Sequence, residues 1–151
     1  MLLGRTPDNL GDVFVAFRGT AQKNLLETPN DLSSLLEFAT FGAAPTQIVA
    51  MYNWWQRVIT PKSPTVPTLV PQYRFTAIGS VVERIADARS TGEIAELLAS
   101  APGAKVSVTG SSLGGHLAMA FAGLFPAAVA QAVAFNSPGF VDTAVVRSLF
   151  E

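Results

Sequence analysis

One serine in this sequence stands in a setting that could make it a nucleophile. Ser112 lies at the centre of Gly110-Ser111-Ser112-Leu113-Gly114, which has the form Gly-x-Ser-x-Gly. The segment follows residues 105–109, which predict a strand, and precedes residues 113–125, which predict a helix. A strand, a tight turn and a helix in that order expose a serine hydroxyl above a sheet, as a nucleophile elbow. The backbone N–H of Leu113, at the start of the helix, is then a candidate oxyanion donor.

The elements that would position this turn alternate along the chain. The predicted strands span 13–17, 105–109 and 130–135, and the predicted helices span 31–40, 45–58, 80–99 and 113–125, with a last helix beginning near Asp142. The helix over 80–99, in which Gly92 allows a break, would turn these residues inward: Val81, Val82, Ile85, Ile94, Leu97 and Leu98. Residues 60–71 contain four prolines and predict an irregular connection.

This order predicts an α/β fold with a largely parallel sheet, formed by residues 1–151 as a single domain. In such sheets, ligands bind beyond the carboxyl ends of the strands. Thr20, Ser112 and Ser137 each follow a predicted strand. We therefore expect these three residues along one edge of the sheet.

Composition narrows the possible functions. The net charge of −1, without a basic cluster, argues against nucleic-acid binding. The absence of cysteine excludes disulfides, thiolate catalysis and cysteine-based zinc sites, and a single histidine argues against a histidine-rich metal site. No apolar run is long enough to span a membrane, and no signal peptide is recognisable. The sequence leaves the compartment open.

Two motifs together resemble the class 3 lipases, an α/β-hydrolase family. They are VFVAFRGT (Val13–Thr20) and VSVTGSSLGGHLA (Val106–Ala118). The resemblance covers residues 13 to about 140 and implies an α/β-hydrolase-type sheet, seen only in part, that cleaves carboxylic esters of lipids. It implies that Ser112 is the nucleophile and that Thr20 lines the oxyanion hole. Ser111 departs from the family, which commonly has histidine there, but this position is outside the catalytic triad.

A serine nucleophile needs a general base, usually a histidine that a carboxylate orients. In α/β-hydrolases the acid and then the histidine follow the serine in the chain. After Ser112, the only carboxylates are Asp142 and Glu151, and the only histidine is His116. The sequence therefore lacks an obvious base and acid.

Three explanations are open. The chain is the front part of a longer enzyme and lacks its C-terminal acid and histidine. Alternatively, it is a small esterase in which His116, four residues from Ser112 on one helix face, serves as the base and Asp142 as the acid. Against this second explanation, His116 also fits plain helix packing, and Asp142 fits a helix N-terminus. The third explanation is an inactive α/β-hydrolase-fold protein that serves as a binding or interaction module.

We therefore expect a serine ester hydrolase, a lipase or esterase, that acts on a lipid or a small ester through an acyl-serine intermediate. This chemistry requires neither a metal nor an organic cofactor. We also expect a homo-oligomer, formed through an exposed apolar sheet edge, or association with the missing C-terminal segment.

Overall fold

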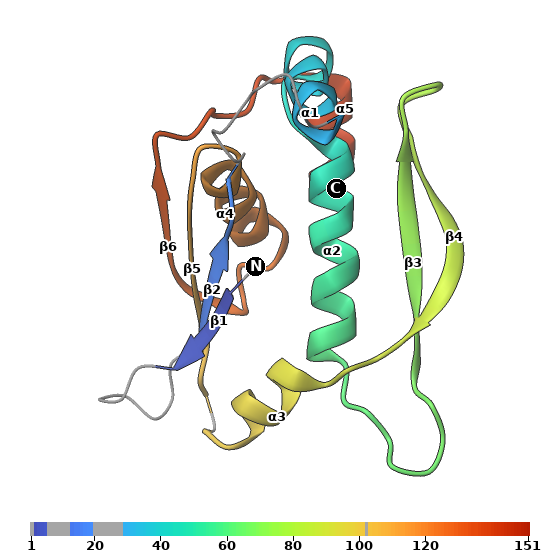
Figure 1. The fold of residues 1–151 in the computed structure, drawn as a ribbon, viewed down its shortest axis with the longest axis vertical. Helices are drawn as coiled ribbons and strands as arrows, with labels where there is room; N and C mark the ends of the chain where they lie inside the picture. The colour runs from blue at the N-terminus through green and yellow to red at the C-terminus, as the bar shows by residue number, and fades with distance from the viewer. Residues whose placement is uncertain (1, 6–12, 20–28, 102) are drawn as a thin grey trace.

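The computed structural model describes residues 2–5, 13–19, 29–101 and 103–151, and Figure 1 shows the fold. It is a mixed α/β fold in which a three-stranded parallel sheet is flanked by helices and accompanied by a small antiparallel sheet. The strands are β1 (Leu2–Arg5), β2 (Val13–Phe17), β3 (Leu69–Thr76), β4 (Val81–Arg89), β5 (Val106–Ser111) and β6 (Val129–Phe135). The helices are α1 (Pro29–Phe41), α2 (Pro45–Ile59), α3 (Glu93–Ala99), α4 (Leu113–Leu124) and α5 (Ala144–Phe150).

The larger sheet has the strand order β1-β2-β5-β6. Strands β2, β5 and β6 are parallel, with Val15 beside Val108 and Val108 beside Ala132. These three strands, and helices α1, α2, α4 and α5, confirm the predicted elements with small shifts of their ends. Strand β1, which the sequence analysis did not predict, pairs antiparallel with β2.

The hydrophobic core lies against the parallel sheet. Burial alternates along β2 and β5, as expected for one face of a pleated strand, and the buried residues are Val13, Val15, Phe17, Val106, Val108 and Gly110. Helix α4 packs on β5 and β6, and α2 packs on α4. In Figure 1 the sheet, α4, α2 and the small antiparallel sheet follow one another across the molecule.

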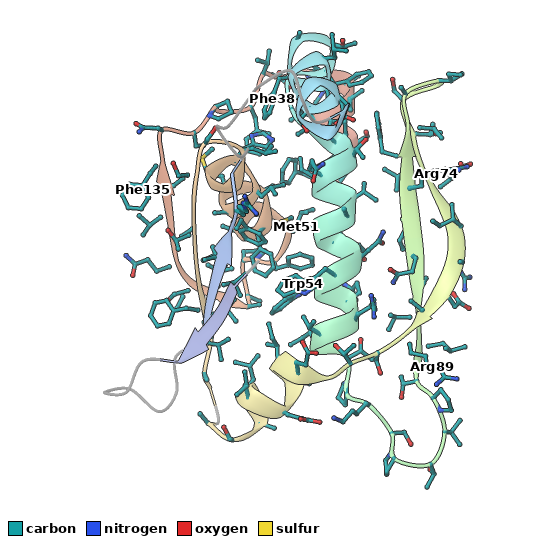
Figure 2. All side chains as sticks on the ribbon, in the orientation of Figure 1. Phe38, Met51, Trp54, Arg74, Arg89 and Phe135 are labelled. Atoms are coloured by element: carbon teal, nitrogen blue, oxygen red, sulfur yellow. The ribbon has the colours of Figure 1, made fainter. Side chains whose placement is uncertain are left out.

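Helix α2 begins at Pro45, where proline is favoured because the first helical N–H has no partner within the helix. Its core-facing side chains recur at helical spacing: Ile48, Met51, Trp55 and Val58. Figure 2 shows Met51 and Trp54 directed from α2 toward the sheet. The Trp54 ring meets Phe17 edge to face, with ring centroids 6.4 Å apart.

The predicted helix over 80–99 is wrong in its first half. Residues Val81–Arg89 form strand β4, which pairs antiparallel with β3, and only Glu93–Ala99 is helical. We call β3, β4 and the turn over 77–80 the hairpin. The predicted irregular connection over 60–71 likewise ends early, because β3 begins at Leu69.

Local backbone chemistry explains the hairpin. The turn contains a hydrogen bond from the N–H of Ser80 to the carbonyl of Ala77 (3.3 Å), and Gly79 adopts a positive φ of 83°, which glycine reaches without strain. The β-branched residues that follow prefer a strand to a helix. Contrary to the prediction, these side chains are exposed, by 51% for Val81, 44% for Val82 and 53% for Ile85. The expected burial is correct for Ile94.

Strand β6 forms one edge of the larger sheet. Its sequence, VAQAVAF, carries no charge and no proline, and every residue in it is half-buried or exposed. Figure 2 shows Phe135, which is 57% exposed, directed away from the helices. Such an edge is able to pair with another strand. Self-association through it stays a prediction.

Candidate active site at the start of α4

Ser112 occupies the tight turn between β5 and α4. Its backbone has φ 55° and ψ −128°, a conformation that non-glycine residues rarely adopt, and the residue is exposed. Its N–H donates a hydrogen bond to the carbonyl of Phe135 (2.9 Å), and its carbonyl accepts one from the N–H of His116 (3.1 Å). The end of β6 and the first turn of α4 therefore hold a conformation that costs about 1–3 kcal/mol.

Glycines make this turn possible. We call residues 110–114 the elbow. A Cβ atom on Gly110 would overlap the carbonyl of Gly114, and a Cβ on Gly114 would overlap the carbonyl of Phe17. Both neighbours are main-chain atoms, which cannot move aside as a flexible side chain can. The two glycines of the motif therefore allow α4 to approach β5 and β2 closely.

The carboxyl end of β2 lies beside the elbow. A Cβ atom on Gly19 would stand 3.4 Å from the Cβ of Ser112 and would overlap the carbonyl of Ser111. Register agrees, since Phe17 pairs with Gly110. Thr20, which follows Gly19 in the chain, lies outside the described residues.

The carboxyl end of β6 meets the same place. A Cβ atom on Gly115 would lie 2.6 Å from the Cβ of Ser137. The structure thus brings Ser112 and Ser137 to one edge of the sheet.

Leu113 is the first residue of α4 and is half-buried. Its N–H belongs to the helix N-terminus, whose dipole favours negative charge.

His116 is fully buried, and main-chain groups occupy both of its ring nitrogens. Nδ1 lies 3.2 Å from the carbonyl oxygen of Pro138, and Nε2 accepts a hydrogen bond from the N–H of Ala44 (3.4 Å). A neutral ring with its proton on Nδ1 satisfies both partners. The ring lies between Phe38 and Phe140, with centroids 4.6 Å and 4.2 Å away. This geometry suits a packing residue better than a base for Ser112.

Burial also favours the uncharged form of the His116 ring. Removal from water lowers the pKa of His116, and hydrogen bonds to the carbonyls of Pro138 and Gly139 oppose that effect only in part. The neutral form is therefore favoured in the folded protein.

Asp142 stands on the surface at the start of α5. Its side chain is 79% exposed and pairs with Arg147 at 2.6 Å. The next residue, Thr143, caps the helix by accepting a hydrogen bond from the N–H of Val146 (3.1 Å). Within the described residues, no hydrogen bond joins the side chain of Ser112 to Asp142 or to the ring of His116. The structure does not assemble these three residues into a triad.

No family model, curated protein or solved structure matches this chain. In the described part of the chain, no group of three or more histidine, aspartate and glutamate residues could hold a metal ion. No described helix is both long and apolar enough to cross a membrane. The case for a function therefore rests on the geometry around Ser112.

Proposed function

We propose that this chain carries the nucleophile of a serine ester hydrolase and that the nucleophile is Ser112. The observation that carries the proposal is an exposed serine with strained backbone angles between a buried strand and a helix. Backbone strain of this kind persists only where the surrounding structure enforces it, and it concentrates at functional sites. A nucleophile elbow has this form because the strain lifts the hydroxyl out of the sheet.

We further propose that the fold is of the α/β-hydrolase type. In support, the strand that leads to Ser112 lies between two parallel neighbours, β2 and β6, and is followed at once by α4. The closeness of Gly19 to Ser112 also supports an oxyanion site between the two strand ends. The N–H groups of Leu113 and Thr20 would line that site.

The reaction would proceed in two steps. The Oγ atom of Ser112 attacks the ester carbonyl carbon, and its proton passes through a base to the departing alcohol. Water then attacks the acyl group on Ser112 and releases the carboxylic acid. In both steps, the negative charge on the carbonyl oxygen would face the N-terminus of α4. The substrate class, carboxylic esters of lipids or small molecules, is taken from the motifs over 13–20 and 106–118.

A second candidate is an inactive α/β-hydrolase-fold protein that serves as a binding module. The observation that favours it is the state of His116, because both nitrogens of the one histidine are engaged with main-chain groups. A chain without a base would retain the elbow but would not turn over esters at a useful rate.

Hydrolysis of a short-chain nitrophenyl ester tests the proposal. Where the purified chain turns over the ester, Ser112→Ala should abolish that turnover and the neighbouring control, Ser111→Ala, should preserve it. Turnover that survives in Ser112→Ala would contradict the assignment of the nucleophile. Absence of turnover in the wild-type chain would fit the second candidate and would equally fit a chain that carries the nucleophile without its general base.

The variant His116→Gln separates the two roles of the histidine. We expect turnover per folded molecule to survive this change. Loss of turnover in a variant that is still folded, as judged by circular dichroism, would instead make His116 the base.

A further inference from the structure

A pocket of about 230 Å³ lies where α2 meets the hairpin. Its walls come from α2, the hairpin, the end of α4 and the end of α5. Val49 and Tyr52 line it from α2, and Tyr73 and Val82 line it from the hairpin. Figure 1 shows the hairpin standing beside α2 at the edge of the molecule.

The lining is almost entirely apolar. No charged side chain contributes to it, and five of its eight residues are aliphatic. The one serine, Ser148, donates its hydroxyl to the carbonyl of Val145 (2.9 Å). A ligand for this pocket therefore needs no charge and can find few polar partners inside it.

Side chains of α1 and α2 hold the hairpin wall of the pocket in place. Asn53 of α2 donates its Nδ2–H to the carbonyl of Tyr73 (2.7 Å) and accepts the N–H of Tyr73 with its Oδ1 (2.9 Å). The rings of Phe41 and Phe75 add an edge-to-face contact with centroids 5.3 Å apart. These contacts fix the position of β3 beside α2, next to the apolar pocket.

The volume of the pocket and its opening to solvent indicate the kind of ligand that it can bind. An apolar cavity of about 150 Å³ stays dry and binds benzene, so 230 Å³ accepts a larger apolar group. Val82 is 44% exposed, so the pocket opens to solvent at the hairpin. We propose that this pocket binds the alkyl chain of a small uncharged amphiphile, with its polar head in solvent beside Val82.

The pocket is separate from the elbow. Leu124, which lines the pocket, ends α4, whereas Ser112 precedes its first residue. At 1.5 Å per residue the two ends of α4 are about 17 Å apart. The proposal therefore does not depend on esterase activity, and the binding experiment is carried out on wild-type protein and on Ser112→Ala with the same expected result.

Titration of ¹⁵N-labelled protein with n-octyl glucoside, below its micelle concentration, tests this proposal. We expect saturable shifts of the amides around Val49, Tyr52 and Tyr73, and none with methyl glucoside, which has the head without the chain. Shifts that grow without saturation, or that centre on β6, would overturn the proposal. So would equal shifts with methyl glucoside.

Two neighbouring residues of β4 give matched variants, because successive side chains of a strand point to opposite faces. Val82→Trp would fill the pocket, and we expect it to weaken binding at least tenfold. Val81→Trp changes a residue that is 51% exposed and outside the pocket, and we expect binding within twofold of wild type. Equal affinity in both variants, or equal loss in both, would contradict the proposal.

A chain-length series on the wild-type protein needs no variant. Each methylene that enters an apolar site adds about 0.8 kcal/mol of binding energy, or about fourfold in affinity. We expect affinity to rise from hexyl to octyl glucoside and then to level off once the pocket is full. A rise that continues unchanged to dodecyl glucoside would indicate a surface without a defined volume and would overturn the proposal.

Discussion

The elbow and the hairpin are attached to the same core by different means. At the elbow, main-chain atoms meet main-chain atoms, as where Gly114 meets the carbonyl of Phe17. At the hairpin, side chains of α2 bind the strand, chiefly through Asn53, and Val81 and Ile85 remain exposed. The elbow therefore depends on glycines, whose missing side chains allow close main-chain packing. The hairpin depends on a few side-chain contacts, each of which a single substitution can remove.

The largest expected effect is at the elbow. In Gly114→Ala, the new Cβ would overlap the main chain at Phe17, and the main chain cannot yield without moving β2. We expect the free energy of unfolding to fall by about 3 kcal/mol, as measured by urea denaturation. Ester hydrolysis, if present, would be lost as well.

Gly139→Ala is the matched control. A Cβ atom on Gly139 would meet no atom within 4 Å, so we expect a change within about 0.5 kcal/mol. Similar losses in both variants would show that close main-chain packing does not distinguish the elbow.

The hairpin should loosen when its main attachment is removed. Asn53→Ala removes two hydrogen bonds to Tyr73, and we expect a loss of about 2 kcal/mol. Hydrogen exchange should quicken at residues 69–89 and stay unchanged at 106–111. If both regions exchange faster by the same factor, the hairpin is not a separately held unit.

A smaller effect should follow pH, through His116 next to the elbow. Burial lowers the pKa of His116 in the folded state, whereas in the unfolded chain it stays near 6.5. Below about pH 6.5 the unfolded chain therefore binds more protons, and the free energy of unfolding falls as pH falls, by at most about 1.4 kcal/mol per unit.

Urea denaturation at pH 7.5, 6.5 and 5.5 measures this dependence. Because His116 is the only histidine, we expect His116→Gln to flatten it. An equal pH dependence in wild type and variant would show that another group titrates.

The smallest expected effect is on the surface of the hairpin. Arg74 pairs with Glu83 across the two strands, and both side chains are largely exposed. Figure 2 places Arg74 on the hairpin, far from the sheet. We expect Arg74→Gln to change the free energy of unfolding by less than about 0.5 kcal/mol. A loss as large as that of Asn53→Ala would mean that charge pairing, and not Asn53, attaches the hairpin.

The same contrast explains what the sequence could predict. The elbow was predictable because its determinants are local: Gly110, Ser112 and Gly114 lie within five residues, between an apolar strand and a helix. The hairpin was not predictable from local sequence because Val81, Val82 and Ile85 also fit a helical face, and a single glycine at position 79 fits a turn before a strand or before a helix. Pairing with β3 decided between the two.

The site was predictable only in part, for a physical reason. The partners of His116 are a carbonyl of Pro138 and an N–H of Ala44, and main-chain groups leave no residue-specific signal in a sequence. Ser112 and His116 are four residues apart, a spacing at which two helical side chains can touch. In the structure, however, the His116 ring lies in the core. Asp142 lies one residue before the N-cap Thr143, outside α5 and not in its first turn, and it pairs with Arg147 on the surface.

The central claim is that the strained, exposed Ser112 is a reactive nucleophile. Treatment of the 151-residue chain with a fluorophosphonate, followed by peptide mass spectrometry, tests it most directly, because this reagent bonds to activated serines without requiring turnover. We predict modification of Ser112 alone, which Ser112→Ala abolishes and Ser111→Ala leaves intact. Failure to label Ser112 in folded protein, or labelling of Ser111 or Ser137 in its place, would contradict the claim.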